Sequence, residues 1–259
     1  MKIDHFQPDD WINVNPKWVQ RFVRWFFSRP GRHIYRYRGY GHDPRTPSEG
    51  GFLLAPGPHG AFLDPFVFAL GQKRTRMRFM AKYQVLEWFG VGRIVRWGGG
   101  FPIHRGGGKS ISGLEVARNI VAKGEGLVMF MEGRLELDGV GLGNPRSGLA
   151  RLALGTGAPV VPVAAWGSKR ARAYGKRWWY HWPRVTVVWG EWIQFPQEEH
   201  PTEERVEEVR DAIWERVSRC FDQANAIAHR PSGRPPKGTP LGQALEMAGY
   251  ELTPGAERT

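Results

Sequence analysis

Short apolar runs alternate with helix-like segments through the middle of the chain, and this alternation limits the folds open to it. Each run has the length of a β-strand. Parallel strands need a long crossover between them, which a helix usually supplies. The pattern therefore predicts an α/β fold with a largely parallel central sheet and helices on both faces. The predicted strands are Gly51 to Pro56, Met77 to Lys82, Gly126 to Met131 and Pro159 to Trp166.

The sequence predicts a single such domain over residues 33–229, flanked by two segments of different character. Within 1–32, aromatic side chains recur on one face of a helical pattern, beside Lys and Arg. That face is formed by Trp18, Phe22, Trp25 and Phe26. Such an amphipathic helix can lie in a membrane interface or pack on the domain core, and periodicity leaves both open. Residues 230–259 are rich in Pro and Gly, so we expect a mostly disordered tail that can hold one short helix near Leu241 to Ala248.

Charge and aromatic content indicate a partner that carries phosphate. The 259 residues include 37 Lys and Arg, 25 Asp and Glu and 12 Trp, and the net charge is +12. Basic surfaces attract anionic lipids, and Trp favours membrane interfaces. Nucleic acid bases stack on the same residue types, but the sequence has no RRM or helix-turn-helix context, and we expect no nucleic acid partner. The single cysteine, Cys220, excludes an internal disulfide and a Cys-based zinc cluster, and we expect no metal site.

An ionisable pair, His59 and Asp64, stands where the first predicted strand gives way to a helix. Turns of this kind hold reactive groups rigidly while leaving them accessible. An alcohol is a poor nucleophile at neutral pH, and an imidazole oriented by a carboxylate can take its proton, so the pair suits a base and its orienter in acyl transfer. The spacing alone is a weak signal, because His5 and Asp10 share it and because Asp64 before a proline also suits a helix N-cap.

Four sequence blocks in a fixed order strengthen this interpretation. They are PHGAFLDPF (58–66), GGFPIHR (99–105), MFMEGRLELDG (129–139) and VVPVAAW (160–166). In order and spacing they resemble the four blocks of the glycerolipid acyltransferase family, which includes the 1-acylglycerol-3-phosphate acyltransferases. The resemblance covers the chain from Gly51 to Gly167.

The resemblance implies the catalytic roles. His59 is then the general base that acts on the acceptor hydroxyl, and Asp64 fixes its tautomer and stabilises its charged form. Glu132 and Gly133 match the core of the third block, which implies that they position the acceptor or supply backbone donors to the oxyanion. The chain contains no Gly-x-Ser-x-Gly elbow, which fits a reaction in which the substrate itself brings the hydroxyl.

The resemblance also implies a phosphate-binding set of arginines. Arg105 ends the second block, where the family binds the substrate phosphate. In the third block Met131 replaces the family's Pro, and Arg134 stands one residue earlier than the family's Arg. We therefore expect Arg134 and Arg146 to share the remaining phosphate contacts.

From these features we expect a peripheral enzyme on the cytoplasmic side of the membrane. It moves a fatty acyl group from acyl-CoA or acyl-carrier protein to the hydroxyl of a lysophospholipid of the 1-acylglycerol-3-phosphate type, in phospholipid biosynthesis. No cofactor is expected beyond this co-substrate, and the expected partners include a membrane surface with anionic lipids. Two alternatives stay open: an acyltransferase of the same family for an amino lipid or glycolipid, and a non-catalytic basic protein that binds membranes or nucleic acid.

Overall fold

A computed structural model describes residues 25, 33, 36–41, 46–59, 64–69, 77–103, 110–133, 141–168 and 184–251. The amphipathic helix predicted within 1–32 lies outside the described residues, apart from Trp25. Arg105 and Arg134 also lie outside them. In the part of the chain that is described, no helix is both long enough and apolar enough to cross a bilayer.

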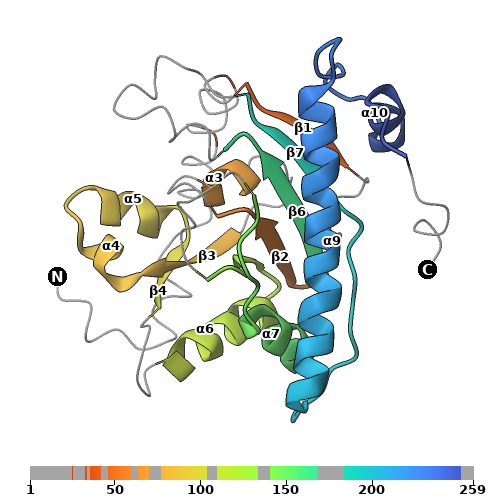
Figure 1. Cartoon of the computed structure of the whole chain (residues 1–259). Coiled ribbons are helices and arrows are strands. Elements are labelled where there is room, and N and C mark those ends of the chain that lie inside the picture. The colour runs from red at the N-terminus through yellow and green to blue at the C-terminus, as the bar shows by residue number, and fades with distance from the viewer. Residues whose placement is uncertain are drawn as a thin grey trace.

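The described residues form a seven-stranded sheet in the order β1-β7-β6-β2-β5-β3-β4 (Figure 1). All neighbouring strands are parallel except β6 and β7, which are antiparallel. The prediction of an α/β domain with a largely parallel sheet is therefore confirmed. The strands are β1 (Arg38–Gly41), β2 (Phe52–Gly57), β3 (Met77–Lys82), β4 (Gly100–Ile103), β5 (Gly126–Val128), β6 (Val160–Trp166) and β7 (Thr186–Trp189).

Helices fill the crossovers between the parallel strands. The short helix α3 (Asp64–Ala69) follows β2, and α4 (Tyr83–Glu87) and α5 (Val91–Trp97) connect β3 to β4. The break between α4 and α5 contains Gly90, and Gly92 stands in the first turn of α5. The remaining helices are α6 (Ser110–Ala122), α7 (Gly148–Thr156), α9 (Glu203–His229) and α10 (Leu241–Met247).

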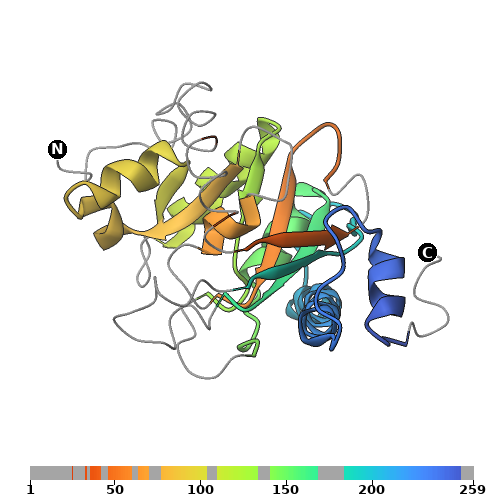
Figure 2. The ribbon, with the colours of Figure 1, turned by 90° about the horizontal axis from the view of Figure 1, so that it is seen from above.

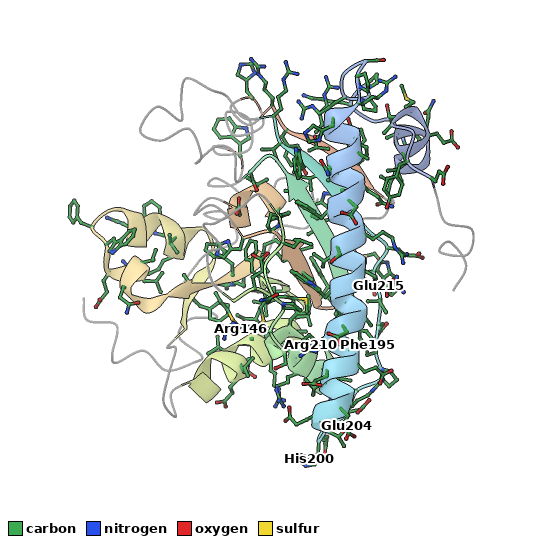
Figure 3. The ribbon with its side chains drawn as sticks, in the orientation of Figure 1. Arg146, Phe195, His200, Glu204, Arg210 and Glu215 are labelled. Atoms are coloured by element: carbon green, nitrogen blue, oxygen red, sulfur yellow. The ribbon has the colours of Figure 1, made fainter. Side chains whose placement is uncertain are left out.

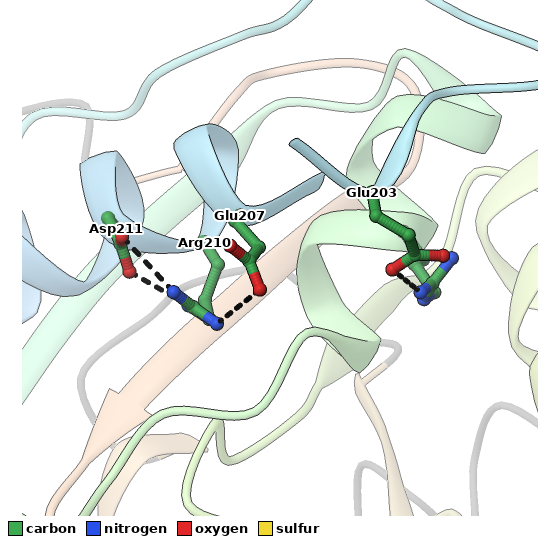
Figure 4. A network of polar contacts seen from close by, with 5 residues as sticks. Glu203, Glu207, Arg210 and Asp211 are labelled. Atoms are coloured by element: carbon green, nitrogen blue, oxygen red, sulfur yellow. Dashed lines mark hydrogen bonds and ion pairs between the residues drawn. The ribbon is translucent and has the colours of Figure 1, made fainter. Parts of the chain in front are cut away.

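The long helix α9 lies across one face of the sheet and packs against β2, β6 and β7 (Figures 1 and 2). Thr202 caps it, since its hydroxyl accepts a hydrogen bond from the amide of Arg205 at 3.2 Å. Ion pairs lie on its exposed side (Figure 4). Arg151 pairs with Glu203 at 2.5 Å, and Arg210 pairs with Asp211 at 2.8 Å. Exposed pairs of this kind contribute little stability, so the apolar face of α9 is what holds it on the sheet.

The centre of the sheet is the core of the protein. Every residue of β2 is buried, and Phe52, Leu53 and Leu54 are among the largest fully buried side chains. One charged pair lies inside this apolar environment: the guanidinium of Arg78 donates to Glu125 at 2.6 Å, and both side chains are almost fully buried. Each charge compensates the other, because either one alone in the core would be costly.

The tail predicted as mostly disordered over 230–259 is instead packed over residues 230–251. The carbonyl of Pro235 accepts hydrogen bonds from the Arg38 guanidinium at 2.6 Å and from the Tyr40 hydroxyl at 2.8 Å. The helix α10 buries Leu241 and Leu245 in a cluster that includes Tyr40. The short helix expected near Leu241 to Ala248 is α10, whereas the contacts of Pro235 depend on Arg38 and Tyr40, which the composition of the tail does not reveal.

Candidate active site

The carboxyl ends of β2, β3, β5 and β6 lie along one edge of the sheet, because these strands are mutually parallel. Open α/β sheets bind their ligands at this edge. His59 stands two residues beyond β2, and Glu132 stands four residues beyond β5. Segments that are 73 residues apart in the sequence therefore meet here, and this edge is the candidate active site.

His59, just beyond β2, lies close to Asp64, the first residue of α3. The Nδ1 atom of His59 is 3.8 Å from an Oδ atom of Asp64. The imidazole is 19% exposed, whereas the carboxylate is 1% exposed. The separation is longer than a hydrogen bond and short enough for an ion pair once the imidazole is protonated. A reachable base beside a buried carboxylate is the arrangement that general base catalysis needs, and such contacts are often long before a substrate binds.

The imidazole of His59 is held from one side by an aromatic ring. Phe130 stacks on it with the ring centroids 3.9 Å apart and an angle of 22° between the planes. Phe68, from α3, meets Phe130 edge-on at 5.8 Å. These contacts restrict the rotation of the imidazole and keep water from one of its faces. Sequence analysis assigned no role to Phe130, although it stands in the third block directly before the Met-Glu-Gly core.

Glu132 fixes the backbone of the turn that carries His59. One carboxylate oxygen accepts the amide N–H of His59 at 2.6 Å, and the other accepts the amide N–H of Gly143 at 2.8 Å. The side chain is 2% exposed, so both bonds form away from bulk water. Bonds from amides to a buried carboxylate are stronger than those between neutral groups. Glu132 therefore clamps the His59 turn to a loop that lies 84 residues further along the chain (143 minus 59).

Gly133 and Arg146 are in contact at this edge. Gly133 has a φ of +67°, and a Cβ atom built on it would lie 2.6 Å from Cδ of Arg146. The amide of Gly133 donates to the carbonyl of Phe130 at 3.1 Å, and the amide of Arg146 donates to the carbonyl of Met131 at 2.8 Å. The Gly133 amide is thus used within the turn in this structure. Met131, where the resemblance expects Pro, is buried in the core.

The described site residues accordingly form one group: His59, Asp64, Glu132, Gly133 and Arg146. Arg146 is exposed and lies just before α7 (Figure 3). Among the residues that the structure describes, no three His, Cys, Asp or Glu side chains are grouped as metal ligands. The reaction available to this group is proton transfer by an oriented imidazole next to an exposed cation.

The sequence and the fold are both similar to those of acyltransferases. The sequence model of the Acyltransferase family matches residues 37–166, which is 130 of the 259 residues. The fold is similar to the crystal structure of the 1-acyl-sn-glycerophosphate (LPA) acyltransferase PlsC from Thermotoga maritima, with a TM-score of 0.55 at 24% identity. That similarity covers 77% of this chain and 80% of the other chain. No curated protein matches the sequence.

Proposed function

Since this chain belongs to the Acyltransferase family, we propose that it transfers a fatty acyl group from a thioester to the hydroxyl of a lysophospholipid of the 1-acylglycerol-3-phosphate type. The observation that carries this proposal is the His59–Asp64 pair, 3.8 Å apart at the carboxyl end of β2. The donor is acyl-CoA or acyl-carrier protein, and the protein works as a peripheral enzyme on the cytoplasmic side of an anionic membrane.

His59 removes the proton of the acceptor hydroxyl as that oxygen attacks the thioester carbonyl. The protonated imidazole then lies beside the buried carboxylate of Asp64, which stabilises the positive charge. The tetrahedral intermediate collapses with cleavage of the C–S bond, and the departing thiolate takes the proton from His59. The products are the diacyl lipid and the free thiol, and no serine nucleophile is needed.

Arg146 is the described candidate for the acceptor phosphate. Its guanidinium is exposed, and its stem lies against Gly133, next to the segment that holds the His59 turn. Arg105 and Arg134 complete the proposed phosphate-binding set. Arg146→Ala should raise KM for lysophosphatidate about tenfold and leave KM for monoacylglycerol, which has no phosphate, unchanged. A wild-type protein that acylates an amino lipid or a glycolipid in preference to lysophosphatidate would favour the second acceptor class.

The proposal is tested by acyl transfer with labelled palmitoyl-CoA and lysophosphatidate, repeated with palmitoyl-acyl-carrier protein. His59→Ala should lower kcat by at least about 100-fold, because the general base is removed. The matched control is His200→Ala, an exposed histidine before the start of α9 (Figure 3), which should retain wild-type activity. Full activity in His59→Ala would disprove the mechanism. A wild-type protein that transfers nothing to any lysolipid would disprove the function.

A further inference from the structure

Three large apolar side chains stand exposed on the α4–α5 hairpin. Phe89 is 103% exposed, Trp88 56% and Trp97 40%. We call these three residues the aromatic tip. They make up half of the exposed large apolar side chains that the structure describes; the others are Trp25, Trp192 and Met247. Exposed apolar groups that gather in one place mark interaction sites, whereas single ones are ordinary.

The hairpin that carries the aromatic tip is firmly built. Gly90 takes a φ of +72° in the turn, and the amide of Gly92 donates to the carbonyl of Trp88 at 2.8 Å. A Cβ atom on Gly92 would lie only 2.0 Å from the carbonyl oxygen of Leu86, so the backbones of α4 and α5 touch there. Leu86 and Val95 are each 2% exposed, and their side chains pack in the core and hold the hairpin there. Trp88 and Phe89 are thus presented by a fixed turn, and Trp97 stands at the end of α5.

The hairpin begins at the same edge of the sheet as the active site and ends at Trp97, just before the amino end of β4. The helix α4 begins at Tyr83, directly after the carboxyl end of β3. β3 is separated from β2 only by β5, which places their ends about 10 Å apart, two strand spacings. Figures 1 and 2 both show α4 and α5 projecting beyond β3 and β4, away from α9. A surface that touches the tip therefore also approaches the side of the molecule where His59 lies.

The charges of the hairpin suit an anionic lipid surface. The guanidinium of Arg93 lies 4.8 Å from the ring centroid of Trp97, a cation–π contact. Arg96 lies in the last turn of α5, and the acidic residue of the hairpin is Glu87. Arginine beside tryptophan is the pairing found where a side chain bridges headgroups and acyl chains.

The size of the tip argues against a protein partner. Three aromatic side chains at these exposures offer about 400–500 Å². A stable protein interface needs about 800 Å² from each partner. A bilayer needs no such area, because a few inserted aromatic rings add to the electrostatic attraction.

We propose that the aromatic tip, Trp88, Phe89 and Trp97, inserts into the interface of a lipid bilayer and docks the active-site edge on the membrane that holds the acceptor. The inference extends the proposed function by giving that site its membrane contact, and it rests on the acceptor being a lipid.

The test compares the full-length protein with the double variant Trp88→Asp/Phe89→Asp. Binding is measured by co-sedimentation with vesicles of phosphatidylcholine containing phosphatidylglycerol, without substrate. The double variant should bind at least about tenfold more weakly, because it lacks the two aromatic rings whose burial in the bilayer interface favours binding. The matched control is Trp192→Asp, at a similarly exposed tryptophan outside the hairpin, and it should bind as wild type does.

Turnover separates docking from catalysis. The double variant should keep wild-type kcat on a short-chain lysophosphatidate that stays monomeric, and should lose activity on the same headgroup embedded in vesicles. Wild-type vesicle binding by the double variant would overturn the inference. If that variant also showed less self-association than the wild-type protein, the tip would be a contact between two copies of the chain instead. If the wild-type protein transfers nothing but the double variant still loses vesicle binding, the proposed function fails and the membrane contact stands.

Discussion

Glu132 acts on the backbone around the reacting atoms. Its two carboxylate oxygens hold the amides of His59 and Gly143 at 2.6 and 2.8 Å. The resemblance alone assigned Glu132 to the acceptor or the oxyanion, whereas the geometry gives its side chain a positioning role. The position of the imidazole depends on this clamp, since the carboxylate holds the backbone amide of His59 itself.

Glu132→Gln should reduce kcat about 100-fold with a smaller change in KM, because a misplaced base costs that much. Glutamine offers one acceptor oxygen, and its NH₂ group would face an amide donor, so one of the two bonds is lost. The expected loss of stability is about 1–3 kcal/mol. Steady-state kinetics and urea unfolding measure the two effects. Glu204→Gln, on the exposed start of α9 (Figure 3), is the control, and a wild-type kcat in Glu132→Gln would refute the positioning role.

Gly133 has a conformation that other residues avoid, and its neighbour leaves no room for a side chain. Gly133→Ala should cost about 1–3 kcal/mol, since it combines a left-handed φ of +67° with a contact 2.6 Å from Arg146 Cδ. Gly141→Ala provides the comparison, because a Cβ atom there would meet nothing within 4 Å. Thermal unfolding of both variants checks the prediction, and equal melting temperatures would contradict it.

The α4–α5 hairpin depends on a backbone contact at Gly92. An exposed helical glycine normally gains about 0.5–1 kcal/mol on replacement by alanine. Gly242→Ala in α10 should show this gain, since a Cβ atom there has open space. Gly92→Ala should instead destabilise the protein, because its Cβ atom would lie 2.0 Å from the Leu86 carbonyl oxygen. Urea unfolding of the two variants should give changes of opposite sign, and a gain at both positions would show that the hairpin can spread at no cost.

Elements with a strong local pattern were predictable from the sequence, and those that depend on distant contacts were not. The apolar runs that begin at Gly51 and Pro159 form β2 and β6. The packing of residues 230–251 was missed, because it depends on Arg38 and Tyr40 almost 200 residues earlier. In the site, spacing and block order brought out His59 and Asp64, but the Phe130 stack and the link from Glu132 to Gly143 are properties of the folded chain alone.

The stability of the whole protein should fall in alkaline solution. Burial raises the pKa of the Cys220 thiol from 9.0 to about 12, and it also raises the pKa of the Tyr40 hydroxyl. A raised folded-state pKa means that the unfolded chain loses its proton first as the pH rises. The free energy of unfolding should therefore drop by about 1.4 kcal/mol for each pH unit above 9, up to about pH 12.

Urea unfolding at a series of pH values from 8 to 10 measures this slope. Cys220→Ala should make it shallower between pH 9 and 10, where the thiol contributes more than Tyr40, whose ordinary pKa of 10.0 lies higher. An unchanged slope in that variant would show that Cys220 does not cause the loss. In the native protein at pH 8, the thiol should also resist alkylation, because little of it is ionised.

The edge strand β1 is the first strand in the described part of the chain, and its neighbour in the sheet comes late in the sequence. It pairs with β7, which begins at Thr186, and the Tyr40 hydroxyl bonds to a carbonyl 195 residues away. Contacts between such distant parts of a chain form only after the intervening polypeptide has been made and folded. During synthesis on the ribosome, β1 therefore stays without its strand partner until β7, residues 186–189 of 259, has emerged. β1 is thus paired only after the described residues of the catalytic edge, up to Arg146, have been synthesised.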